Sequence, residues 1–246
     1  MKDHFSTQSD HYAQFRPNYP SAFFAYLETI IPHKVCAWDC GTGNGQVAVA
    51  LSKWFEKVYA TDISPNQIKH AKKRYNIQYS VQPAENTNFD NGTFDLIMVA
   101  QAIHWFDFDQ FYAEVRRTAK DAAWIAIIGY GKIKVSPAID DIIYRFYQEV
   151  IGPYWDRERK YIEENYETIP FPFKETPVPS FTLQASWTLE HLIGYLQTWS
   201  AVKKFIGQNG FNPVDALIPP LKRQWEGQQT KAITFPMLSR IGKIKP

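Results

Sequence analysis

The stretch Val35-Cys36-Ala37-Trp38-Asp39-Cys40-Gly41-Thr42-Gly43-Asn44-Gly45-Gln46 decides the fold that we expect for this chain. Its apolar first half predicts a buried strand, its glycines predict a tight turn, and the residues from Val47 to Leu51 predict a helix. Glycines at positions 41, 43 and 45 allow the backbone to approach a ligand, because no Cβ atom stands in the way. The start of the helix offers unpaired N–H groups to an anionic ligand. A glycine-rich turn that binds no ligand is the simpler alternative.

The spacing of this motif separates two classes of nucleotide-binding protein. A dinucleotide-binding turn has the pattern G-x-G-x-x-G, whose third glycine would fall at position 46, where this chain has Gln46. The pattern here is D-x-G-x-G-x-G, with Asp39 at the end of the strand. A carboxylate at that point repels a pyrophosphate but suits a ligand that carries an ammonium group. The spacing therefore disfavours a nicotinamide-dependent oxidoreductase.

The motif around Asp39 resembles motif I of the class I S-adenosyl-L-methionine (AdoMet) methyltransferases, whose cofactor carries an amino acid tail and no phosphate. Two further runs narrow the resemblance: Tyr12 followed by Arg16-Pro17-Asn18-Tyr19-Pro20, and A-Q-A-I-H-W-F-D at positions 100–107. Both are similar to the methyltransferase type 11 group that includes trans-aconitate methyltransferase-like enzymes. The resemblance implies AdoMet as the cofactor. It also implies a Rossmann-like α/β fold, with a seven-stranded, mostly parallel sheet, helices on both faces and an antiparallel last strand.

The candidate cofactor site includes Asp62, at the end of a strand predicted for Lys57 to Asp62. An intervening helix brings that acid beside the glycine turn, where its carboxylate can accept hydrogen bonds from both hydroxyls of a ribose. A role as helix cap is the weaker alternative, because Ser64 already supplies one. The resemblance implies further cofactor contacts from the N-terminal arm, the glycine turn and later strand ends: Tyr12, Arg16, Tyr19, Asp39, Gly41, Gly43, Gly45, Ile63, Ala84, Glu85 and Gln101. The arm residues could instead lie on the surface, and Glu85 could be a solvated helix start.

The candidate catalytic residues are His104 and Trp105, which follow the strand predicted for Phe94 to Ala100. Chemistry in open α/β sheets lies beyond the carboxyl ends of the strands. Trp105 could offer its ring face to a positive sulfonium, and His104 could orient or deprotonate the methyl acceptor. The alternatives are a structural, hydrogen-bonded histidine and a tryptophan that packs a helix on the sheet.

We expect a single domain over residues 1–246, with an arm over the cofactor at 1–20 and a small helical lid inserted at 137–178. The lid contains basic and aromatic side chains, among them Arg157 and Arg159, and a solvated surface excursion is the alternative. Later, Pro219-Pro220 should end or kink a short helix that begins at Asn212-Pro213. Pro236 should place the last strand near an edge of the sheet.

Composition limits the function classes. A net charge of +2 argues against a nucleic-acid or membrane-surface partner bound by bulk charge. Cys36 and Cys40 are too few for a metal site and are poorly placed to bridge each other, so we expect reduced thiols, a cytoplasmic location and no metal. No run approaches a membrane span of about 18 apolar residues. We expect a monomer or weak homodimer that methylates a small molecule, with a carboxylate of an organic acid as the acceptor. The alternatives are N- or phenol O-methylation and a non-catalytic AdoMet-binding regulator.

Overall fold

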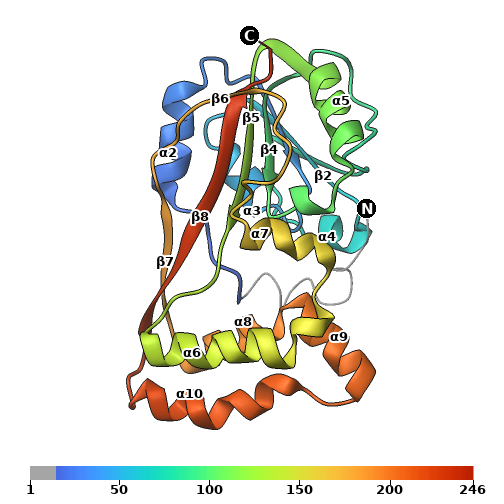
Figure 1. Ribbon diagram of the computed structural model, residues 1–246. Helices are drawn as coiled ribbons and strands as arrows, with labels where there is room; N and C mark the ends of the chain where they lie inside the picture. The colour runs from blue at the N-terminus through green and yellow to red at the C-terminus, as the bar shows by residue number, and fades with distance from the viewer. Residues whose placement is uncertain (1–14, 246) are drawn as a thin grey trace.

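The protein is described by a computed structural model over residues 15–245. Within that range eight strands form the sheet, in the order β3-β2-β1-β4-β5-β8-β6, with β7 paired to β8 beside this path (Figure 1). Strands β1 to β5 run parallel, and β8 is antiparallel to β5, β6 and β7. The strands are β1 Cys36–Cys40, β2 Lys57–Asp62, β3 Ile77–Val81, β4 Phe94–Ala100, β5 Ala119–Tyr130, β6 Lys174–Glu175, β7 Thr182–Trp187 and β8 Lys231–Lys243. The predicted Rossmann-like, mostly parallel sheet with an antiparallel last strand is confirmed. It has eight strands where seven were predicted, because the two-residue β6 also pairs with β8.

Helices cover both faces of the sheet, because the central strands are apolar on both sides. In β4, Leu96 and Met98 face the core formed with α2 and α3, whereas Ile97 and Val99 face the core formed with α5 and α7. This two-sided burial is typical of parallel strands. The covering helices are α2 Ser21–Ile30, α3 Gln46–Leu51, α4 Pro65–Lys69, α5 Phe108–Thr118 and α7 Lys160–Glu163.

A separate group of helices packs at one end of the sheet, at the bottom of Figure 1. It consists of α6 Pro137–Arg145, α8 Leu189–Gln197, α9 Ser200–Asn209 and α10 Ile218–Trp225, and we call it the helical layer. Short helical turns η1 Ile103–Trp105, η2 Phe146–Val150, η3 Gly152–Tyr154, η4 Arg157–Arg159 and η5 Pro213–Leu217 complete the fold. The helical layer shares one hydrophobic core with residues of β7 and β8, so segments far apart in sequence stabilise each other. None of the helices within residues 15–245 is both long and apolar enough to cross a membrane.

The structure bears on two expectations about proline. Pro236 lies within β8, and only the two-residue β6 separates β8 from the edge of the sheet, so the last strand is near an edge as predicted. β8 pairs with β5 on one stretch and with β7 on another. The Pro236 carbonyl accepts a hydrogen bond from Gly131 N. Pro236 has no N–H to donate, and it lies where the pairing with β7 ends and the pairing with β5 begins. The short helix η5 begins at Pro213 after its Asn212 cap and ends at Leu217, just before Pro219 and Pro220, as predicted. These two prolines lie in the first turn of α10, where no N–H partner is needed.

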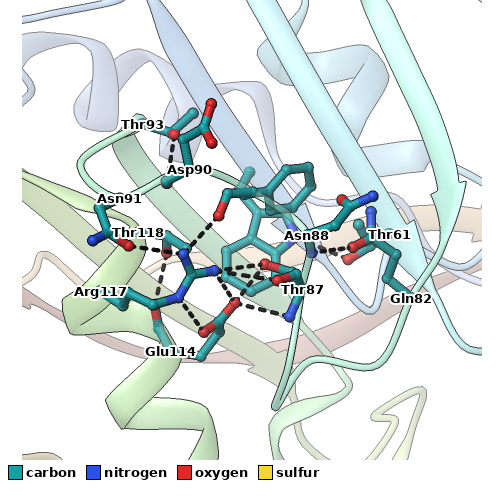
Figure 2. A network of polar contacts seen from close by, with 12 residues as sticks. Thr61, Gln82, Thr87, Asn88, Asp90, Asn91, Thr93, Glu114, Arg117 and Thr118 are labelled. Carbon is teal, nitrogen blue, oxygen red and sulfur yellow. Dashed lines mark hydrogen bonds and ion pairs between the residues drawn. The ribbon is translucent and has the colours of Figure 1, made fainter.

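A buried ion pair fixes the loop between β3 and β4 against α5 (Figure 2). The Glu114 carboxylate accepts hydrogen bonds from Thr87 N and from two nitrogens of Arg117, at 2.7 to 2.9 Å. Arg117 Nη1 also donates to Phe89 O and to Asn91 Oδ1. Burial alone raises the pKa of Glu114, but the hydrogen bonds from Arg117 and Thr87 outweigh it and lower the pKa. The loop that follows β3, on the cofactor side of the sheet, is thereby held by α5.

We expect Glu114→Ala to lower the free energy of unfolding by about 2 kcal/mol at pH 7. Breaking a buried pair costs about 3–5 kcal/mol, and the partly exposed Arg117 recovers part of this by hydration. Since the Glu114 pKa is lowered on folding, its stabilisation is present above pH ~4.3, the ordinary glutamate pKa, and is lost as the pH falls through the folded value. Urea unfolding of wild type, Glu114→Ala and the control Glu114→Gln, which keeps an acceptor oxygen, measures the loss. Equal stability of all three proteins would contradict it.

Candidate active site

An open cleft lies at the carboxyl ends of β1, β2 and β4. It encloses about 930 Å³ including its open mouth, which is within the range of sites for small organic molecules. The predicted residues in its wall are Arg16, Tyr19, Asp39, Gly41, Gly43, Asp62, Ile63, Gln101 and Trp105. These come from four segments of the chain, and the parallel sheet brings the three that follow β1, β2 and β4 to one edge.

The three glycines of the turn have different roles. All three have positive φ, but a Cβ at Gly41 would lie 2.6 Å from Ala102 Cβ and a Cβ at Gly45 would lie 2.2 Å from Tyr79 Oη. At Gly43 the nearest atom to such a Cβ is Gln67 Oε1, at 3.9 Å. Gly41 and Gly45 are therefore required by packing of the protein against itself. Gly43 alone leaves bare backbone in front of open space, where a ligand can approach.

Asp39 is a buried carboxyl group with one oxygen left over. Thr42 Oγ1 donates to its Oδ2 at 2.5 Å, while Oδ1 is buried and has no hydrogen-bond partner of normal geometry within the described residues. Burial raises the pKa of Asp39 to about 7, although Thr42 and the Ala48 amide act in the opposite direction. A buried acceptor without a donor is costly, so the geometry suits a ligand that brings a positively charged donor.

Asp62 joins the end of β2 to the glycine turn. Its Oδ2 accepts a hydrogen bond from Gly43 N at 2.8 Å, and its Oδ1 accepts one from Ser64 N at 2.9 Å. A carboxylate has about four lone-pair sites, so a carboxylate at this position can bind several donors at once. Ser64 caps α4 by accepting from Gln67 N, as its position in the sequence indicates.

Some predicted cofactor residues lie elsewhere. Ala84 is buried in the core beneath α5, and Glu85 Oε1 accepts a hydrogen bond from Asp107 N; neither is in the wall of the cleft. Gly45 is behind the turn, against Tyr79. Tyr12 lies outside the described residues.

The structure also adds residues that we did not predict for the site. Gln67 is buried in the cleft wall, and its Oε1 has no partner within residues 15–245. Tyr130, at the end of β5, accepts a hydrogen bond from Arg16 Nη1 at 2.7 Å. Gln67 stands out in sequence only as part of a helix cap. Tyr130 gives no local signal, because its partner is 114 residues away.

A second cavity adjoins the cleft and shares Arg16, Gln101 and Trp105 with it. Its remaining wall comes from His104, from Trp155, Asp156, Arg159 and Ile162 of the predicted lid segment, and from Trp199 and Ser200 at the start of α9. His104 is buried, and this burial together with the nearby Arg159 lowers its pKa to about 3. His104 is therefore a neutral imidazole at physiological pH. Trp105 lies where the two cavities meet.

The arrangement fits AdoMet when each polar group is taken in turn. Asp39 Oδ1 lacks a donor within residues 15–245, the Asp62 carboxylate lies in the wall of the cleft, and the open side of Gly43 admits a ligand. Within the part of the chain that the structure describes, no three His, Cys, Asp or Glu side chains cluster as metal ligands would. The cleft and the second cavity meet at Gln101 and Trp105, just after β4, so a ligand in one would face a ligand in the other.

Known proteins identify the class of this protein. A methyltransferase domain family (Methyltransf_11) matches residues 38–127. A proposed methyltransferase of Dictyostelium discoideum is 36% identical over 208 residues, covering 83% of this chain and 79% of the relative. A methyltransferase of Aspergillus candidus is 28% identical over 188 residues, covering 65% and 59% of the two chains. The structure of a proposed type II methyltransferase from Anaeromyxobacter dehalogenans superposes with a TM-score of 0.87 at 37% identity, covering 94% and 99%. The chain belongs to the class I methyltransferases, and AdoMet is its cofactor.

Proposed function

We propose that the protein transfers the AdoMet methyl group to a carboxylate oxygen of a small organic acid. The cofactor occupies the open cleft, and the acid occupies the second cavity beside His104. In this proposal residues 15–20 belong to the arm over the cofactor, and the part of the lid at 155–162 closes the acceptor cavity. The two free cysteines agree with a cytoplasmic location. Both cavities are built from one chain, so a monomer suffices.

Three residues hold the cofactor in this proposal. Asp39 Oδ1 accepts from its ammonium group, Asp62 accepts from its ribose hydroxyls, and Gly43 allows the close approach between them. Trp105, at the junction of the cavities, presents its ring to the sulfonium, a cation–π contact worth roughly 0.5–2 kcal/mol. Gln101 and Arg16 line both cavities and align the acceptor with the cofactor.

The low basicity of His104 is the observation that carries the choice of acceptor. An imidazole whose pKa is about 3 is a poor general base, so it cannot readily deprotonate an amine or a phenol. A carboxylate needs no deprotonation, because it is ionised above pH ~4. The charge of the cavity agrees with an anion: Arg16 and Arg159 line it, and burial and Arg16 lower the pKa of neighbouring Lys203.

The chain then contributes positioning and exclusion of water. When bound, AdoMet supplies an electrophilic methyl group on its sulfonium. One carboxylate oxygen forms the new C–O bond as the C–S bond breaks, and the electron pair of that bond stays on sulfur, so no proton is transferred. Alignment and water exclusion of this kind can supply about 7–11 kcal/mol. The tryptophans at 105, 155 and 199 form the apolar walls that achieve it.

A screen with isotope-labelled AdoMet tests the proposal, with matched acids, their amides, amines and phenols as acceptors. We expect methyl ester formation from acids, with release of S-adenosylhomocysteine, and no product from the amides. Methylated amines or phenols would contradict it. Binding of AdoMet without turnover of any acceptor would indicate a non-catalytic regulator instead.

A further inference from the structure

Three backbone features converge on the hydroxyl group of Tyr166. Gln101 and Tyr166 both have positive φ, at 53° and 64°, a conformation that is unusual for side chains of this size. Gly129 of β5 leaves room for both, since a Cβ there would lie 2.8 Å from Tyr166 Oη and 2.9 Å from Gln101 Oε1. Backbone strain of this kind clusters at functional sites. The Tyr166 ring is completely buried, directly behind His104.

The hydrogen bonds of Tyr166 determine which ring nitrogen of His104 carries the proton. Tyr166 Oη donates its single proton to Gln101 Oε1, at 3.2 Å, and lies 3.4 Å from His104 Nδ1. With that proton committed, Nδ1 can bond to Tyr166 only as the donor. Because the imidazole is neutral, the lone pair is then on Nε2. Nε2 has no hydrogen-bond partner within the described residues, and His104 lines the acceptor cavity.

The guanidinium group of Arg159 also lines this cavity. Arg159 Nε donates to Tyr147 Oη at 3.0 Å, and the guanidinium lies 4.6 Å from the centre of the Trp155 ring. Its two Nη nitrogens have no partner within residues 15–245, and such a fork matches a carboxylate. Asp156, which is paired with Lys204 through Oδ1, has a buried Oδ2 without a partner in that range. The wall thus combines donors for an anion with acceptors that lack a donor.

We propose that Tyr166 is a positioning residue that holds His104 as a hydrogen-bond acceptor, and that the methyl acceptor is a hydroxylated carboxylic acid. The carboxylate of the acid binds beside Arg16 and Arg159, and the hydroxyl of the acid donates to His104 Nε2. The donor is a neutral hydroxyl and not an ammonium, because Arg16 and Arg159 would repel a second cation. The substrate class rests on the proposed carboxylate methylation, whereas the role of Tyr166 can be tested without any acceptor.

Nitrogen NMR of ¹⁵N-histidine-labelled protein at pH 7 tests that role, with His104 assigned by its loss in His104→Gln. We expect a proton on Nδ1 in wild type and a mixture of the two tautomers in Tyr166→Phe. The control is Tyr112→Phe, which removes another largely buried hydroxyl, one that donates to Pro170 O, and should leave the tautomer unchanged. Normal AdoMet binding shows that each variant is folded. A proton on Nε2 in wild type, or the same tautomer in Tyr166→Phe, would overturn the role.

Matched acids test the substrate class: 2-hydroxybenzoate, benzoate and 2-methoxybenzoate, and mandelate with phenylacetate. We expect wild type to favour the hydroxylated acids by about 10- to 100-fold in kcat/KM, since an unpaired buried acceptor disfavours the others. Tyr166→Phe should lose most of this preference. Equal use of hydroxylated and plain acids would overturn the substrate class and leave carboxylate methylation standing. If neither the hydroxylated nor the plain acids react while AdoMet binds normally, carboxylate methylation and the substrate class both fail.

Discussion

Asp62→Ala is expected to bind AdoMet roughly 30- to 1,000-fold more weakly than wild type, a loss of about 2–4 kcal/mol. Two contributions add. The ribose hydroxyls lose a charged acceptor, and hydrogen bonds to a charged group are worth about 1.5–3 kcal/mol each. The glycine turn also loses the bond from Gly43 N to the carboxylate. Ser64 still caps α4 through Gln67 N, so we expect the protein to stay folded.

Calorimetry can separate these two contributions. We compare S-adenosylhomocysteine with its 2′-deoxy analogue, which cannot donate from the missing hydroxyl. In wild type the 2′-deoxy analogue should bind more weakly than S-adenosylhomocysteine. In Asp62→Ala this difference should disappear. A loosened glycine turn would instead weaken both ligands equally. Asp62→Asn, which keeps one acceptor oxygen, should give an intermediate result. An unchanged affinity in Asp62→Ala would remove Asp62 from the cofactor site.

Asp39→Asn is expected to stabilise the cofactor-free protein and to weaken AdoMet binding about 100-fold, the reverse of what a purely structural residue would do. Asp39 is completely buried, and its pKa of about 7 exceeds the ~3.9 of an exposed aspartate. Its ionised form is therefore disfavoured in the folded protein until a positive ligand arrives. Asparagine has the shape of the neutral acid but cannot pair with an ammonium group.

The sign of the pH dependence follows from the raised pKa. Between the two pKa values the folded state binds more protons than the unfolded state, so wild-type stability falls as the pH rises. From pH 5.5 to 7.5 this group should remove about 2 kcal/mol from the free energy of unfolding, and Asp39→Asn should not show that loss. AdoMet affinity should move the other way, rising roughly 20-fold over the same range as Asp39 ionises, because the ionised form binds the cation.

Urea unfolding and calorimetry at both pH values measure the two trends. Glu114→Gln is a matched control, since it neutralises a buried acid away from the cleft and should keep the wild-type pH dependence of cofactor binding. The same pH dependence of affinity in Asp39→Asn and in wild type would show that another group controls binding.

Patterns in the sequence predicted many of the residues that line the open cleft, because that part of the structure depends on local rules. A strand, a tight turn and a helix are specified within twelve residues around Asp39, and the parallel crossover to Asp62 has few alternatives. Trp105 and Gln101 follow from the rule that sites lie at the carboxyl ends of strands. Residues after β3 were less certain, and Ala84 and Glu85 lie outside the wall of the cleft.

The acceptor side depends on tertiary structure. Arg159 influences His104 across 55 residues, and Tyr166 reaches Gln101 across 65 residues. No periodicity encodes such pairs, because they result from how residues 157–166 pack on strand ends far away in sequence. The shared core of α6 with α8, α9 and α10, and the position of Pro236 inside a paired strand, have the same origin. The sequence by itself determined the fold class, the cofactor and the two acids that line the open cleft. Only the tertiary structure decided which side chains surround His104, and thereby whether that histidine is charged, basic or a neutral hydrogen-bond acceptor.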